Sequence, residues 1–324
     1  MQPTMQQLDI FADSREVELR NAVLEELQRR DGDGARTALD QLATEFPGDG
    51  MLSAMRVLVQ ELQRAPATPF ADHAALTVAR RHLEEEVVPA ARRVLPAQTV
   101  CAWLAPCWSS LAQRAAALPF RGADHHADGH AEMHAAPLWL HAGEWAAAHK
   151  SVDGIESWWR IPAPLAWMTE ARYRMGGLDA AWPLLVELAW LGPRRFATVL
   201  SVFGEASLDA LRRRLDAEFP GSGELDDYVW FPAWLLVVKP ALAGRLREAR
   251  VLGDQAASRA CALLGEILRR QHEGDQHELV GLRQELSHLH EGLSTPIWRR
   301  GKCSTGNRRK GANGCCMKQS AGRP

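Results

Sequence analysis

The sequence predicts an all-α fold, and three observations support this. Apolar residues recur at helical spacing, Gly and Pro breakers separate helix-length segments, and runs that alternate β-branched and polar residues are absent. The chain has 324 residues, 46% of them hydrophobic and 24% charged, which is enough to build a buried core. One compact core rarely exceeds about 250–300 residues, so two subdomains or an elongated stack of helices both fit this length.

The first helix is predicted over 14–30. Asp13 is followed three residues later by Glu16, the spacing of a capping box at a helix start. Apolar residues such as Leu24 and Leu27 then fall mostly on one helical face. Residues before this cap are therefore expected to be extended.

Further helices are predicted along the chain, each ended by Gly or Pro. Their ranges are 35–46, 51–64, 71–94, 97–117, 131–142, 144–156, 163–175, 178–191, 206–218, 226–249, 254–271 and 276–293. The predicted organisation is an extended N-terminal peptide over 1–12, an α-helical repeat domain over 13–293, and a disordered basic tail over 294–324.

The helical segments come in pairs joined by short Gly-containing turns, as in antiparallel helical hairpins. A shift of 34 residues superposes Trp139 on Tyr173, Gly143 on Gly177, Ala146 and Ala147 on Ala180 and Ala181, and Val152 on Val186. This is the period of the tetratricopeptide repeat, and these units resemble that family. TEFPGDG at 44–50 also recurs as AEFPGSG at 217–223, which indicates diverged units.

The resemblance covers about half of the chain, and residues 66–130 and 226–293 do not fit the period. It implies a solenoid of stacked hairpins with a concave groove that binds a peptide or a partner helix. The function it implies is that of a protein–protein interaction scaffold, not an enzyme.

The pentapeptide Gln7-Leu8-Asp9-Ile10-Phe11 resembles the peptide by which bacterial replication and repair proteins dock on the DNA sliding clamp. Leu8, Ile10 and Phe11 would fill an apolar pocket, and the Gln7 amide would hydrogen-bond at its rim. The resemblance implies a second function, that of a replication or repair accessory protein docked on the clamp. The other interpretation is that Leu8 and Phe11 fold back onto the first hairpin.

A histidine-rich stretch offers a third hypothesis, a metal-dependent enzyme built on residues 126–141. His126, His130 and His134 are four residues apart, so on one helix they would share a face that chelates zinc or nickel. Glu132 stands at the wrong place for the H-E-x-x-H arrangement of a metalloprotease. A solvated connector is the alternative, and no metal or cofactor is predicted.

Tryptophan is concentrated in one part of the chain. Seven of the twelve lie within 52 residues, at positions 139, 145, 158, 159, 167, 182 and 190. Such aromatics pack between helices or line a groove. Trp158 and Trp159 are the candidate groove aromatics, because adjacent side chains on a helix cannot both face the core.

The net charge of −2 conceals an acidic body and a basic tail. From Arg299 onward there are eight basic residues and no acidic ones, which leaves 30 basic and 40 acidic residues over 1–298. An acidic body argues against direct nucleic-acid readout. The abrupt change of composition over 294–324 also fits translation from a shifted reading frame.

The sequence favours a cytoplasmic location and a protein partner. No secretory signal is visible at the start, and the most apolar run, residues 230–238, is too short for a bilayer that needs about 20 residues. The six cysteines show no disulfide framework, which suits a reducing compartment. P-loop, dinucleotide-binding, nucleophile-elbow and C-x-x-C motifs are absent.

Overall fold

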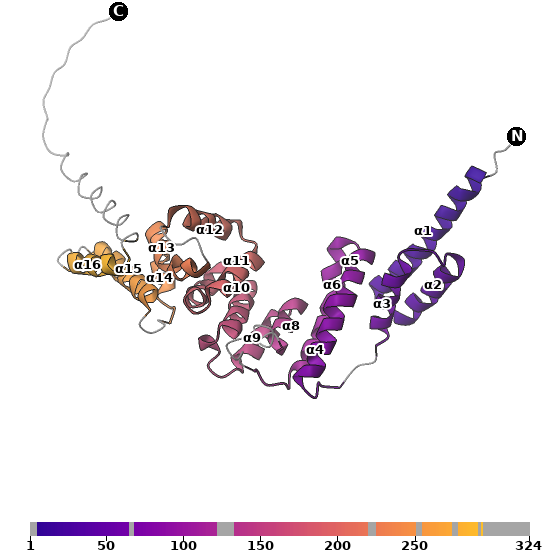
Figure 1. Ribbon diagram of the computed structural model, residues 1–324, viewed down its shortest axis with the longest axis horizontal. Helices are drawn as coiled ribbons and strands as arrows, with labels where there is room; N and C mark the ends of the chain where they lie inside the picture. The colour runs from indigo at the N-terminus through magenta and orange to yellow at the C-terminus, as the bar shows by residue number, and fades with distance from the viewer. Residues whose placement is uncertain are drawn as a thin grey trace, which may run out of the picture. The chain divides into compact units, whose positions relative to one another are not determined.

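The computed structural model describes residues 5–64, 68–121, 133–219, 225–250, 255–273, 278–290 and 293, with side chains from Arg15 onward. Every regular element in these ranges is helical, which confirms the all-α prediction for them (Figure 1). The chain divides into two compact units, unit 1 (Met1–Gly177) and unit 2 (Leu178–Pro324). The range expected to be one repeat domain is thus two units.

Unit 1 is a succession of helices in which each packs mainly on its neighbours along the chain. The elements are α1 (Met5–Arg29), α2 (Gly32–Glu45), α3 (Leu52–Leu62), α4 (His73–His82), the π-helical η1 (Leu83–Val87), α5 (Val88–Val94), α6 (Ala97–Ala115), α8 (Ala135–Ala142), α9 (Trp145–Asp153), the 3-10 turn η2 (Trp158–Arg160) and the first part of α10 (Pro162–Leu191).

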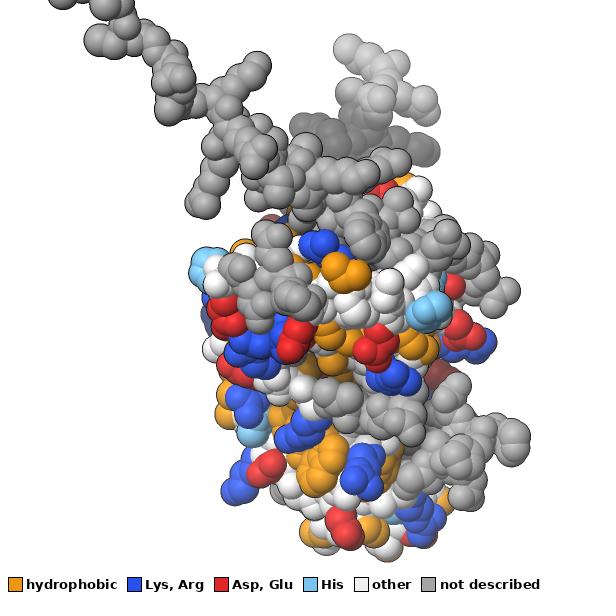
Figure 2. Space-filling model, turned by 90° about the vertical axis from the view of Figure 1, so that its left-hand side faces the viewer, with side chains coloured by type: hydrophobic (Ala, Val, Ile, Leu, Met, Phe, Trp, Pro, Cys, Tyr) orange, Lys and Arg blue, Asp and Glu red, His pale blue; other side chains and the backbone are white. Residues whose placement is uncertain are grey.

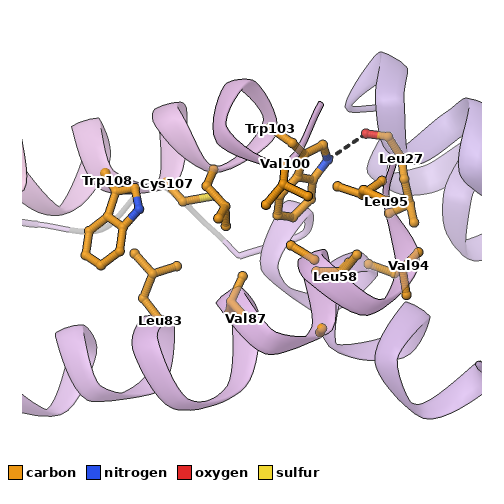
Figure 3. Packing of buried hydrophobic residues seen from close by; sticks show 14 of the residues in the cluster. Leu27, Leu58, Leu83, Val87, Val94, Leu95, Val100, Trp103, Cys107 and Trp108 are labelled. Atoms are coloured by element: carbon orange, nitrogen blue, oxygen red, sulfur yellow. Dashed lines mark hydrogen bonds between the residues drawn. The ribbon is translucent and has the colours of Figure 1, made fainter. Parts of the chain in front are cut away.

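The core of unit 1 forms where the apolar faces of α1, α3, α5 and α6 meet. Figure 3 shows Leu58 of α3, Val87 of η1, and Trp103 and Cys107 of α6 packed in one buried cluster. Each side chain that is fully removed from water contributes about 1.5–3 kcal/mol. Contacts such as those of α3 with α5 add to the packing between neighbours in the chain, so these helices share one core.

Unit 2 is built around α15. It contains the second part of α10, α11 (Pro193–Phe203), α12 (Ala206–Glu218), η3 (Leu225–Trp230), α13 (Phe231–Val238), η4 (Pro240–Leu242), α14 (Ala243–Leu246), α15 (Ala256–Glu273) and α16 (Leu279–Leu289). Helix α15 packs on both α13 and α16, and α11 packs on η3. Among the described residues no single helix could cross a membrane, while the bent pair Leu225–Val238 and Pro240–Leu246, at 107°, passes by length and composition alone.

The start of the first helix differs from the prediction. Helix α1 begins at Met5, so the backbone of residues 7–11 is helical and Asp13 lies inside the helix instead of capping it. Asp13 favours an N-cap position, but no Gly or Pro lies between Met5 and Asp13 to interrupt the helix there. The helix therefore continues through Asp13. The expected boundary at residue 12 is therefore not a boundary of secondary structure.

Two further predictions were wrong in unit 2. The sequence analysis missed α11, whose Pro193 stands at the first turn of the helix, where its missing N–H costs nothing. The helix expected over 226–249 is broken, because Pro240 has no N–H to continue α13 and Lys239 leaves the helical region. The segment instead forms η3, α13, η4 and α14 in turn.

The helix expected over 71–94 is continuous but changes its winding. Asp72 caps α4 by accepting the N–H of Ala75 at 2.8 Å. The turns at Leu83–Val87 then widen into a π-helix just before Pro89. A proline clashes with the carbonyl four residues earlier, and a wider turn relieves that clash.

The 34-residue period has a structural counterpart at its two glycines. Gly143 ends α8 in the left-handed region at φ +78°, and Gly177 breaks α10 at φ +69°. Val152 and Val186, which the shift superposes, are both fully or almost fully buried. Glycine is the residue that takes positive φ without strain, so both glycines of the period interrupt helical geometry, although ψ differs between them (11° and −170°).

The repeated EFPG segment also ends a helix in both places. Helix α2 ends at Glu45 and α12 at Glu218, and the N–H of the following phenylalanine bonds the carbonyl four residues back at 2.8 Å in each. The proline that follows prevents further helix. The same local sequence therefore stops two separate helices in the same manner.

A candidate binding cleft

Helix α15 carries small side chains on a face beside its core face, some of them buried and some open to solvent. Its core face presents Ala257, Ala260, Leu264 and Ile267. Another face presents Ser258, Cys261, Ala262, Gly265, Glu266 and Arg269, spaced three and four residues apart. This second face forms the floor of a cleft within unit 2.

Residues from α10, α13 and the segment 243–249 complete the cleft. They are Trp190, Leu236, Ala243, Leu246, Arg247 and Ala249, and the enclosed volume is about 320 Å³. Gly265 lies in the floor, and a Cβ placed on it would meet no atom within 4 Å. The cleft is therefore apolar along its length and empty at the point where α15 lacks a side chain.

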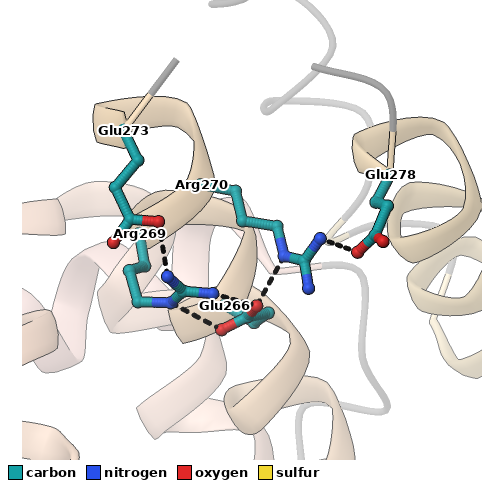
Figure 4. A network of polar contacts seen from close by, with 5 residues as sticks. All are labelled: Glu266, Arg269, Arg270, Glu273 and Glu278. Atoms are coloured by element: carbon teal, nitrogen blue, oxygen red, sulfur yellow. Dashed lines mark hydrogen bonds and ion pairs between the residues drawn. The ribbon is translucent and has the colours of Figure 1, made fainter. Parts of the chain in front are cut away.

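The rim of the cleft on α15 is a network of charges (Figure 4). The Glu266 carboxylate accepts hydrogen bonds from Nε of Arg269 at 2.9 Å and from Nε of Arg270 at 2.5 Å. Arg269 also pairs with Glu273, and Arg270 with Glu278. Hydrogen bonds from Arg269 and then Arg270 lower the pKa of Glu266 to about 2, so this carboxylate is ionised and already engaged.

The opposite rim carries Arg247, which is exposed and has no ion pair among the residues described in unit 2. Its neighbours in sequence differ in this respect, since Arg245 pairs with Asp179 and Arg250 with Glu187. On the face in Figure 2, apolar side chains lie between basic and acidic ones. The cleft thus combines an apolar floor with one uncompensated guanidinium.

A buried carboxylate holds the wall that contains Arg247. Glu187 on α10 is 2% exposed, and its Oε1 accepts the backbone N–H of Arg250 at 2.8 Å. The Arg250 guanidinium lies 3.8 Å from Oε2. Burial raises the pKa of Glu187, and the two contacts from Arg250 oppose that shift only in part. This bond fixes the end of the segment 243–250 against α10.

The Cys261 thiol and the Ser258 hydroxyl line the floor of the cleft. Burial raises the pKa of Cys261 to about 12, so the thiol stays protonated at neutral pH and is a poor nucleophile. The Ser258 hydroxyl donates to the carbonyl of Gln255 at 2.9 Å. Neither group stands beside a base in the described lining of the cleft. The arrangement suits recognition of a ligand more than chemistry on it.

Trp190 lines the cleft with a largely buried indole. It is 5% exposed, and its Nε1 has no acceptor among the described residues. An unsatisfied buried N–H costs about 1–3 kcal/mol.

The pentapeptide Gln7, Leu8, Asp9, Ile10 and Phe11 is not part of this cleft. It belongs to α1 in unit 1, and its side chains lie outside the described residues. The backbone is helical here, whereas a linear docking peptide was expected to be extended. The clamp interpretation therefore still rests on the sequence pattern.

The histidine hypothesis loses one of its three ligands. His126 and His130 lie outside the described residues. His134 does not lie on the expected helix but caps α8, with Nδ1 accepting the N–H of Ala136 at 3.2 Å. Its ring stacks on Trp167 at 5.8 Å, and burial followed by the charge of His73 lowers its pKa to about 4. His134 is thus a buried, neutral helix cap.

Trp158 and Trp159 lie on the 3-10 turn η2 of unit 1. Trp158 is buried and Trp159 is partly buried, and their rings meet edge to face at 6.0 Å. The expectation assumed α-helical geometry, which does not apply to this 3-10 turn, so the role of these two residues as groove aromatics stays a prediction. Neither side chain lines the cleft of unit 2.

Unit 1 has a wider space of about 800 Å³ beside the end of α6 and α9. His134, Trp139 and Lys150 contribute to its wall. It lies where the described chain is interrupted between Arg121 and Met133, and its histidine is already engaged as a helix cap. The cleft in unit 2 is the better-defined site.

Sequence reasoning did not find the cleft. Trp190 is one of the seven clustered tryptophans, and the sequence gives no sign that Arg247, Gly265 and Arg269 lie beside it. A local signal existed in α15, where Ser258, Cys261, Ala262 and Gly265 are small residues at helical spacing on one face. The other walls come from α10, α13 and α14. No local pattern in the sequence indicates that these helices lie beside α15. No protein family, curated protein or solved structure matches this chain.

Proposed function

We propose that this protein is a non-enzymatic scaffold of tetratricopeptide-like helical hairpins, and that it binds a segment of a partner protein in the cleft of unit 2. The positive-φ glycines Gly143 and Gly177, one period apart, support the repeat interpretation. So does the succession of helices in unit 1, each packed on its neighbours in the chain.

The observation that carries the binding role is the face of α15 that contains Gly265. Ala262 is exposed on this face, and a Cβ at Gly265 would meet no atom within 4 Å, so this part of the face is open toward the cleft. A cleft near the lower end of the range for ligand sites, about 300–1,000 Å³, holds one or two side chains of a partner and is small for a dinucleotide. Helical scaffolds bind partner peptides in grooves of this kind.

A filling substitution tests this role. A phage-displayed random decapeptide library would be selected on the immobilised full-length protein, and each selected peptide would be measured again on Gly265→Leu. The leucine side chain enters open space, so the fold is expected to persist while the cleft is filled. Binding of the selected peptides is expected to fall at least 10-fold.

Gly281→Leu is the matched control. Gly281 is an exposed helical glycine of α16, and a Cβ there also meets no atom within 4 Å. It lies outside the lining of the cleft. Selected peptides should bind this variant as they bind the unmodified protein. Peptides that bind Gly265→Leu undiminished would show that the cleft is not the binding site.

The clamp peptide is a second candidate function, carried by the pattern of residues 7–11. Because α1 includes these residues, docking as an extended peptide requires the first turns of the helix to unwind. The full-length protein should then bind a purified bacterial sliding clamp with micromolar affinity, measured by calorimetry. A Leu8→Ala/Phe11→Ala double variant should abolish the heat signal, and heat that is unchanged by it would remove this candidate.

A further inference from the structure

We infer that the partner segment pairs an apolar side chain of about the size of Leu, Met or Phe with a nearby acidic residue, and that the acidic side chain binds Arg247. This inference rests on the proposed function, because it names the chemistry of the segment that the unit 2 cleft would hold.

The floor of the cleft sets the apolar part of the ligand. Trp190, Leu236 and Leu246 supply apolar surface on the sides, while Ala262 and Gly265 keep the floor low. A volume of about 320 Å³ admits one large apolar side chain with part of its backbone. Burying such a side chain contributes about 1.5–3 kcal/mol before the costs of association.

The rim sets the charge. Glu266 would attract a basic ligand, but Arg269 and Arg270 already occupy both of its oxygens. Arg247 has no carboxylate within the described part of unit 2. A carboxylate from outside is therefore the complementary group, and a guanidinium binds one through paired N–H donors.

The position of Arg247 depends on the bond between Glu187 and Arg250. That bond, at 2.8 Å, fixes the segment three residues beyond Arg247 against α10. The backbone that carries the Arg247 guanidinium is therefore held in place, which lowers the entropic cost of binding a carboxylate.

The test uses the peptides selected on the full-length protein. They should be enriched in an apolar residue within three positions of Asp or Glu. For synthetic, fluorescein-labelled copies, an amide in place of that carboxylate (Glu to Gln, or Asp to Asn) should weaken binding about 10-fold by fluorescence anisotropy, as expected for loss of a charge-assisted hydrogen bond.

A charge reversal supplies the specific readout. Arg247→Glu should weaken the acidic peptides at least 10-fold and improve the binding of copies that carry Lys in place of the acid. Arg56→Glu is the control, because Arg56 is an exposed arginine of α3 in unit 1 and changes the net charge equally. It should leave both sets of peptides unchanged.

The outcomes separate the two proposals. Peptides that depend on Gly265 but lack an acid, or that ignore Arg247→Glu, would overturn the inferred partner chemistry and leave the binding cleft standing. Peptides that bind Gly265→Leu undiminished would overturn both. Acidic, Arg247-dependent peptides lost on Gly265→Leu support both.

Discussion

The indole N–H of Trp103 on α6 donates to the backbone carbonyl of Leu27 on α1 at 2.8 Å, in the buried core of unit 1 (Figure 3). Arg30 lies over the same indole ring, at 5.0 Å from its centroid, and donates to the carbonyl of Trp103 at 2.5 Å. Arg30 takes the left-handed conformation, at φ +59°, to end α1. The end of the first helix is therefore fixed by a residue more than seventy positions away.

Trp103→Phe should lower the free energy of unfolding by about 1–2 kcal/mol, because it removes a buried hydrogen bond and keeps most of the ring. Urea denaturation followed by circular dichroism measures this. Trp139→Phe is the control, since that indole is partly buried and makes no hydrogen bond among the described residues. Equal losses in the two variants would mean that packing alone accounts for the effect.

His134 should make the protein sensitive to acid. Its pKa is about 4 in the folded chain against about 6.5 unfolded, so below pH 6.5 the unfolded state binds a proton that the folded state does not. The free energy of unfolding should fall from pH 6.5 toward pH 4 by up to about 1.4 kcal/mol per pH unit.

His134→Asn tests the origin of that slope. Asparagine keeps a cap acceptor for Ala136 but loses the ring stacked on Trp167. The variant should be less stable at pH 7 and show a flatter profile between pH 6.5 and 4, by denaturation at each pH. His134→Ala should lose about 1 kcal/mol more at every pH, because it also lacks the cap. A slope as steep as in the unmodified protein would assign the sensitivity elsewhere.

Glu187 should act in the opposite pH direction. Its pKa is raised in the folded chain, so its contribution to stability is full below the unfolded value near 4.5 and is lost as the pH rises through the folded value. Glu187→Gln keeps an acceptor for the Arg250 N–H and removes the buried charge. Its melting temperature relative to the unmodified protein should rise between pH 4.5 and 7.

Glu266→Gln provides the comparison for Glu187→Gln, because the pKa values of the two carboxyl groups are shifted in opposite directions. The pKa of Glu266 is lowered, so its contribution is present above the unfolded value and is lost only in acid. This variant should lose melting temperature relative to the unmodified protein as the pH rises from about 2 to 4.5, and should change little between pH 4.5 and 7. Matching signs in the two variants would contradict the assignment of one carboxylate to a buried site and the other to a guanidinium pair.

Gly265→Ala should stabilise the protein by about 1 kcal/mol, because alanine favours the helix and its Cβ enters open space. Gly34→Ala should do the reverse, since a Cβ there would lie 2.7 Å from the Asp31 carboxylate that caps α2. Differential scanning calorimetry would measure both shifts. Destabilisation by Gly265→Ala would mean that the cleft is filled by the chain itself.

Local sequence is enough to specify the helical class of the described residues and many helix ends, because these depend on chemistry within a few residues. Spacing of apolar residues, a glycine able to adopt positive φ at Gly143, and a proline after Phe46 or Phe219 all act within a few residues. Helices α6 and α12 accordingly lie close to where the pattern placed them.

Where α1 begins, which role His134 has and whether a cleft exists all depend on packing between helices. Polar residues such as Asp13 and His134 can serve as caps, interior residues or ligands, and their surroundings select among these roles. The cleft needs Trp190, Leu236, Arg247 and Gly265 in one place, although they span nearly eighty residues of sequence. Side chains so distant meet only through the packing of whole helices, which a local pattern does not encode.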